Sequence, residues 1–112
     1  MATFHRALDL AALPADALHP VTVAGREVLL VRRGDAVRAV ANRCSHEDAR
    51  LDGGFLDGDA VECPRHGACF DLATGRALTL PATRPLETYP VRLEAGAVWI
   101  GVPDAGESET RS

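Results

Sequence analysis

Two Cys/His pairs in one short, glycine-rich segment constrain this chain more than any other feature. The first pair is Cys44-x-His46 and the second is Cys63-x-x-His66, with sixteen residues between His46 and Cys63. Residues 43–77 also hold five of the ten glycines and little apolar sequence, which predicts loops and short strands. A segment of this kind has too few apolar residues to build its own core, so a bound metal centre is the expected source of its stability.

The sequence around this segment predicts strands, because apolar and β-branched residues alternate there. They are expected at residues 4–8, 21–23, 27–32, 36–41, 87–93 and 97–102. The tight turns between them are predicted at Ala24-Gly25, Arg33-Gly34-Asp35 and Glu94-Ala95-Gly96. No window of a dozen residues has helical periodicity, although residues 8–18 leave room for a turn or two of helix ended by Pro14. The expected fold class is all-β.

The length of 112 residues fits one domain with one modest core. Because only 4% of the residues are aromatic, that core must consist mainly of Val, Leu and Ala, with Val28-Leu29-Leu30-Val31 at its centre. We expect a single domain over residues 1–102, with the metal-binding insert at about 43–77. The polar residues 103–112 show no pattern and are expected to form a disordered tail.

Charge and composition exclude several classes of function. The formal net charge is -4 and the chain contains no lysine, which argues against nucleic acid as a partner. The first twenty residues lack the apolar run of a signal peptide, and no stretch reaches the length of a membrane span, so a soluble cytoplasmic protein without a membrane partner is expected. Three cysteines without an export signal favour metal ligation over a disulfide framework.

Acidic residues gather between the two Cys/His pairs, where a single Arg50 accompanies them. They are Glu47, Asp48, Asp52, Asp57, Asp59 and Glu62. A solvated loop surface explains such a run, and a docking face for a basic partner is the alternative.

Two metal centres are compatible with two cysteines and two histidines. Zinc binds Cys2His2 sites tetrahedrally, but its common fingers group Cys with Cys and His with His. In a Rieske centre, two Cys hold one iron of a [2Fe-2S] cluster and two His hold the other, so two loops that each supply one Cys and one His bind both irons. The alternating order favours the second centre, with Cys44, His46, Cys63 and His66 as the cluster and metal ligands. A structural zinc module stays open as an alternative.

The whole pattern resembles the Rieske-type [2Fe-2S] ferredoxins of aromatic-ring-hydroxylating dioxygenase systems. C-x-H-x16-C-x-x-H is followed by Gly-Ala-x-Phe-Asp-x-x-x-Gly, and residues 81–86 with Tyr89-Pro90-Val91 resemble the proline loop and strand that cover the cluster in this family. The resemblance implies a small antiparallel β-sandwich or barrel with an inserted, loop-rich cluster-binding subdomain. It also implies one [2Fe-2S] cluster and no catalytic residue in this chain.

The resemblance also predicts the type of Rieske protein. Respiratory-chain members carry two further cysteines that form a disulfide, and this chain has Ala49 and Arg65 at those positions. Their cluster-bonding Ser and Tyr are matched by Ala68 and Phe70, which cannot donate, so a reduction potential on the order of -150 mV is expected.

The function implied is that of a soluble, monomeric one-electron carrier and not of an enzyme. It would pass electrons from an NAD(P)H-dependent flavoprotein reductase to a terminal Rieske oxygenase that hydroxylates aromatic compounds, the rings of His46 and His66 facing the partner. The small subunit of an assimilatory nitrite reductase is the alternative. A second, mononuclear iron site is not expected, because only His5 and His19 remain as histidines, and Cys69 is interpreted as a packing residue.

Overall fold

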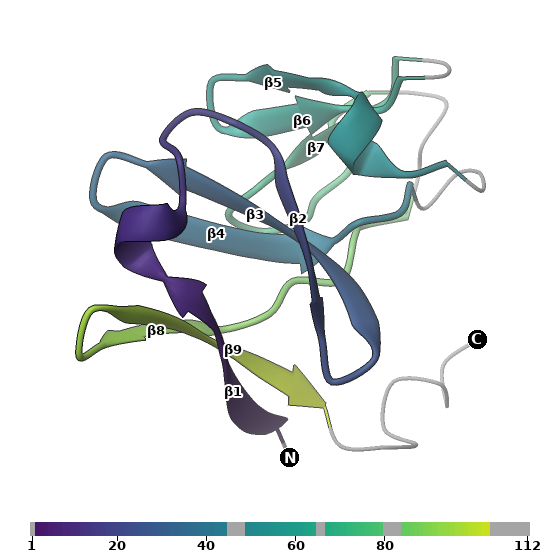
Figure 1. Ribbon diagram of the computed structural model, residues 1–112. Coiled ribbons are helices and arrows are strands. Elements are labelled where there is room, and N and C mark those ends of the chain that lie inside the picture. Colours follow the sequence, from purple (N-terminus) through teal and green to yellow (C-terminus); the bar gives the residue numbers. More distant parts are fainter. Residues whose placement is uncertain (1, 45–48, 65–66, 80–83, 104–112) are drawn as a thin grey trace.

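The computed structural model describes residues 2–44, 49–64, 67–79 and 84–103. This part of the chain contains nine strands, two short 3-10 helices and no α-helix. The strands form three antiparallel sheets of three strands each, which Figure 1 shows as three layers. The all-β class expected from the sequence is therefore confirmed.

The bottom layer in Figure 1 has the strand order β1-β9-β8, the middle layer β2-β3-β4 and the top layer β5-β6-β7. The bounds are β1 Ala2–Asp9, β2 His19–Val23, β3 Arg26–Arg33, β4 Ala36–Ala41, β5 Phe55–Asp57, β6 Ala60–Glu62, β7 Cys69–Asp71, β8 Val91–Glu94 and β9 Ala97–Pro103. The 3-10 helices are η1 Leu10–Ala12 and η2 Leu51–Gly53.

Strand β3 forms the centre of the molecule because both of its faces are buried. Leu29 and Val31 pack into one hydrophobic core with β6 and β7, while Val28 and Leu30 pack into a second core with β9. All four side chains are fully buried, as the continuous apolar run predicts. The middle sheet thus separates two cores, one of which lies under the top sheet.

Two of the predicted hairpin turns have positive φ at both central residues, the pattern of type I′ turns. These residues are Ala24 (φ 50°) with Gly25 (φ 81°), and Ala95 (φ 52°) with Gly96 (φ 73°). The third turn has positive φ at Gly34 (φ 60°). All three connect the strands that the sequence predicts them to connect.

The six predicted strands are present. The strand predicted for residues 36–41 has these bounds as β4, and the other five have shifted ends. The strand predicted for residues 87–93 begins only at Val91, although Thr88 forms an isolated bridge with Val40. The expected helical turn is the three-residue η1, shortly before Pro14. β9 continues through Pro103, the first residue of the expected tail, and residues 104–112 lie outside the described residues.

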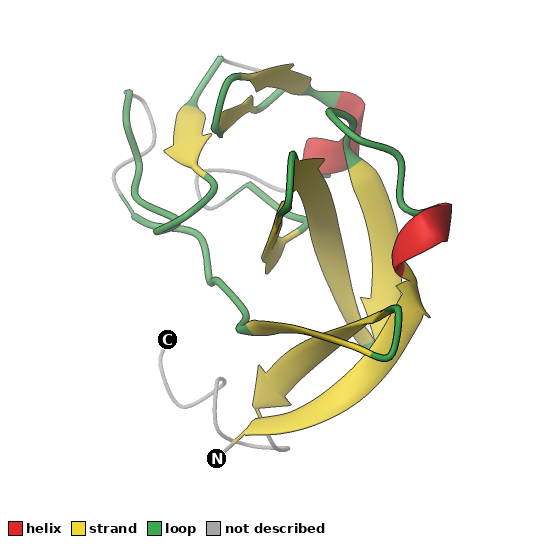
Figure 2. Ribbon diagram, turned by 90° about the vertical axis from the view of Figure 1, so that its left-hand side faces the viewer, coloured by secondary structure: helices red, strands yellow, loops and turns green. Residues whose placement is uncertain are grey.

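The insert at residues 43–77 contains the whole top sheet, with three strands of three residues each. Figure 2 shows that the loop before β8 runs along one side of the molecule. None of the described residues belongs to a helix long and apolar enough to cross a membrane.

Candidate metal centre

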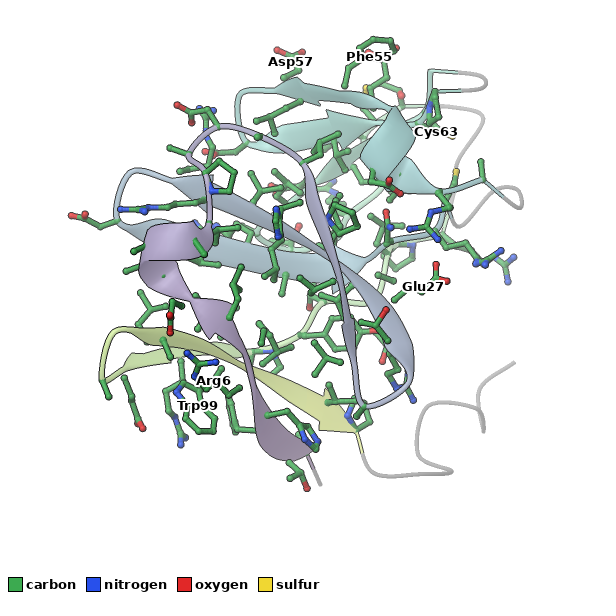
Figure 3. The ribbon with its side chains drawn as sticks, viewed as in Figure 1. Arg6, Glu27, Phe55, Asp57, Cys63 and Trp99 are labelled. Carbon is green, nitrogen blue, oxygen red and sulfur yellow. The ribbon has the colours of Figure 1, made fainter. Side chains whose placement is uncertain are left out.

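Cys44 and Cys63, the two predicted thiolate ligands, both lie in the core beneath the top sheet. Cys44 follows β4 and is 5% exposed, whereas Cys63 follows β6 and is 1% exposed. Figure 3 places Cys63 at the same end of the molecule as Phe55 and Asp57, with Arg6 and Trp99 at the other end. The fold therefore brings two cysteines that are far apart in the sequence into one core of the molecule.

The two loops that begin at these cysteines are closed in the same way. The Cys44 N–H donates to the Ala49 carbonyl at 2.9 Å, and the Cys63 N–H donates to the Ala68 carbonyl at 2.7 Å. In both loops the chain returns to the cysteine after five residues. His46 and His66 fall within these two loops in the sequence but lie outside the described residues, so their predicted role as ligands stays a prediction.

The donor set fits a Rieske cluster as far as the structure describes it. All three cysteines of the chain are described, and none forms a disulfide. Cysteine sulfurs are the ligands that iron–sulfur clusters require, and two of them are held here out of water by apolar neighbours. Within the described ranges no three His, Cys, Asp or Glu side chains converge.

The motif that follows the second loop shapes a turn beneath the site. Phe70 is fully buried, and the Asp71 carboxylate accepts hydrogen bonds from the Ala73 N–H at 3.2 Å and the Thr74 hydroxyl at 3.0 Å. Gly75 has φ 77°, and a Cβ there would overlap the carbonyl oxygen of Leu86. In the motif Phe-Asp-x-x-x-Gly, the Phe therefore fills the core, the Asp fixes the turn, and the Gly leaves room for the neighbouring backbone.

The segment that resembles the proline loop returns to the same core. The Leu86 N–H donates to the Gly75 carbonyl at 2.7 Å, and its side chain is 5% exposed in the core with Cys44 and Cys63. Residues 80–83 of this segment lie outside the described residues. Tyr89 packs into the other core.

The remaining candidates take ordinary structural places. Cys69 lies in β7, is partly exposed and belongs to neither core. Its thiol donates to the Gly67 carbonyl at 3.6 Å. Cys69 is therefore not a core residue. His5 lies within β1 and His19 begins β2, both partly exposed.

The acidic run is partly engaged within the molecule. Asp52 forms an ion pair with Arg50 at 3.0 Å and Asp59 forms one with Arg33 at 3.3 Å. Glu47 and Asp48 lie outside the described residues. At two of the four described positions, intramolecular pairing therefore explains the carboxylate without a docking partner.

Sequence reasoning passed over Asn42, the one polar side chain that is buried in the described part of the chain, at 1% exposure. It directly follows β4 and precedes the loop of Cys44. A single Asn in the sequence does not indicate that it is buried, because its burial depends on where the loop after Cys44 rejoins the sheet.

Comparisons with known proteins agree with this geometry. The Rieske [2Fe-2S] domain model matches residues 4–90, and the chain belongs to this family. A 3-phenylpropionate/cinnamic acid dioxygenase ferredoxin subunit of Shigella flexneri serotype 5b (strain 8401) is 49% identical over 79 residues, which are 70% of this chain and 74% of the relative.

Solved structures narrow the class further. The ferredoxin of carbazole 1,9a-dioxygenase from Nocardioides aromaticivorans IC177 superimposes with a TM-score of 0.84 at 35% identity, over 88% of this chain and 96% of that one. A chain in the complex of reduced oxygenase and oxidized ferredoxin of carbazole 1,9a-dioxygenase matches with a TM-score of 0.81 at 31% identity, over 87% and 91%. Within its family the chain is thus a ferredoxin of the aromatic-dioxygenase type, an electron carrier.

Proposed function

We propose that this chain carries one electron at a time on a single [2Fe-2S] cluster held by Cys44, His46, Cys63 and His66. It takes the electron from an NAD(P)H-dependent flavoprotein reductase and delivers it to a terminal Rieske oxygenase that hydroxylates an aromatic compound. The observation that carries the proposal is the burial of two cysteines in one core, each at the start of a loop that returns to it after five residues.

The residues of this chain have defined tasks in that function. The cluster, when bound, accepts one electron and releases it without making or breaking a bond to a substrate. Cys44 and Cys63 supply two negative thiolates, while neutral His46 and His66 add no charge, which makes the electron easier to accept than on a four-thiolate cluster. Leu51, Val61 and Phe70, all fully buried, exclude water from the side of the cysteines that faces the core.

The partners are proposed by analogy with the relatives. The relative with 49% identity is a dioxygenase ferredoxin subunit, and one structural match comes from a complex of an oxygenase with a ferredoxin. We expect this chain to act as a monomer in the cytoplasm, since a carrier must leave one partner to reach the next. No specific observation favours the alternative of a nitrite reductase subunit, which the fold by itself would also permit.

The proposal is tested by metal analysis and spectroscopy of the purified protein. We expect about two irons per chain, as a [2Fe-2S] cluster requires, no zinc, and an EPR signal with a low average g only after reduction by dithionite. Cys44→Ser and Cys63→Ser should lose the cluster. Cys69→Ser makes the same exchange at the cysteine outside the proposed site and should retain it.

Electron transfer is measured with a flavoprotein reductase and a terminal oxygenase of an aromatic dioxygenase system. Reduction by the first and oxidation by the second would support the assignment of partners. A colourless protein that contains one zinc and no iron after anaerobic expression would overturn the proposal and leave a structural zinc module.

A further inference from the structure

The loop that carries Cys44 is closed at its base by two side-chain hydrogen bonds. The Asn42 amide Nδ2 donates to Asp52 Oδ1 at 2.8 Å, and the Asp52 backbone N–H donates to Asn42 Oδ1 at 2.9 Å. The two residues thus exchange a pair of hydrogen bonds, as opposite residues of an antiparallel ladder do. The ring lies directly after β4, which ends at Ala41.

A second set of contacts ties the same ring to the middle sheet. The Asn42 backbone N–H donates to the Glu27 carbonyl at 3.1 Å. Arg50 bridges the Asp52 carboxylate (3.0 Å) and the Glu27 carboxylate (3.1 Å), and Glu27 is labelled in Figure 3. Both ends of the loop are therefore fastened to β3.

Burial decides which of these contacts matters most. The side chains of Arg50 and Glu27 are 52% and 44% exposed, so water and salt weaken their attraction. Asn42 is 1% exposed, and water cannot replace a hydrogen bond that is lost there. The ring between Asn42 and Asp52 is therefore the stronger fastening, and the Arg50 bridge is secondary.

Closing the loop reduces the number of positions that Cys44 can adopt. Asn42 and Asp52 enclose residues 43–51, and Leu51 at the far end is fully buried. With both ends fixed, the Cys44 sulfur has less freedom before a metal binds and less freedom to leave afterwards.

We propose that Asn42 is a positioning residue for the metal centre. Through its hydrogen-bonded ring with Asp52, Asn42 holds the two ends of the Cys44 loop at a fixed separation. The inference rests on the proposed function, because the loop presents ligands only if Cys44 and His46 bind the cluster. Asn42 itself is not proposed as a ligand.

The test compares the cluster-loaded wild type with N42A, N42D and the double exchange N42D/D52N. N42D removes the amide donor and sets two carboxylates against each other. The double exchange reverses the roles: the carboxylate at position 42 can accept from both the backbone N–H and the side-chain amide at position 52. D57N is the matched control, because it removes one exposed carboxylate from β5 without touching the ring. The rate of cluster loss to an excess of iron chelator is followed by visible absorbance, and the EPR g values and the midpoint potential are measured on the same samples.

N42A is expected to accelerate cluster loss roughly tenfold, the equivalent of about 1.4 kcal/mol, as the loss of a buried hydrogen bond would. The EPR lines of N42A should broaden and its midpoint potential should shift, because Cys44 is held less uniformly. D57N should stay within about twofold of the wild type, as a surface change does. The double exchange should recover a large part of the retention lost in N42A or N42D, which a loss of packing alone would not allow.

Two results would overturn the inference and leave the proposed function intact. One is an N42A protein whose cluster-loss rate, g values and potential all equal those of D57N. The other is a double exchange that folds but loses the cluster roughly tenfold faster than D57N, the effect expected of N42A. This result counts even if N42A itself does not fold. A wild-type protein without iron would instead overturn the proposed function.

Discussion

At the scale of single residues, a backbone contact beside the site makes a sharp prediction. A Cβ on Gly54 would overlap the carbonyl oxygen of Glu62, the residue that precedes Cys63. Backbone cannot move aside as a flexible side chain can, so Gly54→Ala should lower the free energy of unfolding by about 3 kcal/mol, the upper end of ordinary single substitutions. Urea unfolding followed by circular dichroism measures this change.

The neighbouring Gly53 provides the control for this prediction. A Cβ at Gly53 meets nothing within 4 Å and its φ is not positive, so Gly53→Ala should change the free energy of unfolding by less than about 0.5 kcal/mol. Equal effects of the two substitutions would contradict the steric account.

Asp52 makes a residue-scale prediction about pH. The hydrogen bond from Asn42, and next to it the contact with Arg50, hold the pKa of this carboxyl below its ordinary value. Because the folded pKa is lower than the unfolded one, the ionised carboxylate stabilises the fold above about pH 4, and this stabilisation is lost as pH falls through the folded pKa. The difference in free energy of unfolding between wild type and D52N should therefore shrink between pH 6 and pH 3.

Urea titrations of both proteins at several pH values measure this difference. Acid sensitivity of the cluster affects both proteins and cancels in the comparison, and D57N serves as the reference for simple removal of a charge. A difference that stays constant down to pH 3 would show that Asp52 keeps no special interaction in the folded state.

At the scale of elements, strands with strong local signals were predictable from the sequence. β3 has its apolar run, and the hairpins have Ala-Gly or Gly-Asp at their turns. The three-residue strands β5, β6 and β7 were not predicted one by one, because their pairing depends on the fold of the insert. The strand predicted from residue 87 begins later, since Pro90 has no N–H to donate to a ladder.

The candidate site divides in the same way. Cys44 and Cys63 were predicted as ligands from their spacing to histidine, a pattern that needs no knowledge of the fold, and the structure shows both of them buried in one core. Asn42 was missed because its partner is ten residues away, and only the returning loop brings the two together. The positions of His46 and His66 stay predictions.

Strand β3 makes the element-scale prediction, because adjacent leucines on it face opposite cores. Leu29 packs into the core that contains Cys44 and Cys63, whereas Leu30 packs into the core with Val98. Both are fully buried, so Leu29→Ala and Leu30→Ala should each lower the free energy of unfolding by roughly 2–5 kcal/mol. Only Leu29→Ala should also accelerate cluster loss to a chelator, measured at a temperature where both variants remain folded.

Each leucine variant is the control for the other, since the residue type, the strand and the burial are the same. Cluster loss at equal rates from the two variants would mean that overall stability alone governs retention, and that the core beneath the cysteines has no special part in it.

At the scale of the whole molecule, the two cores have different roles, since only one of them contains the predicted cysteine ligands. The core beneath the top sheet holds both cysteines together with Leu51, Val61 and Phe70. The other core joins the middle sheet to β9 through Leu30, Val98 and Ile100 and contains no cysteine. We therefore expect the core with Leu30, Val98 and Ile100 to fold without the metal, and the core with the cysteines to need it.

Hydrogen exchange with and without the cluster tests this division. After removal of iron by a chelator, the amides of β5, β6 and β7 should exchange at least tenfold faster, because their short strands lose the ligand-held loops at their ends. The amides of β1 and β9 should keep their protection, since they pair along seven residue positions on the far side of the middle sheet. Mass spectrometry of exchanged peptides resolves the two sets. An equal loss of protection in β1 and β9 would show that the two cores unfold as one unit and that the cluster stabilises the entire chain.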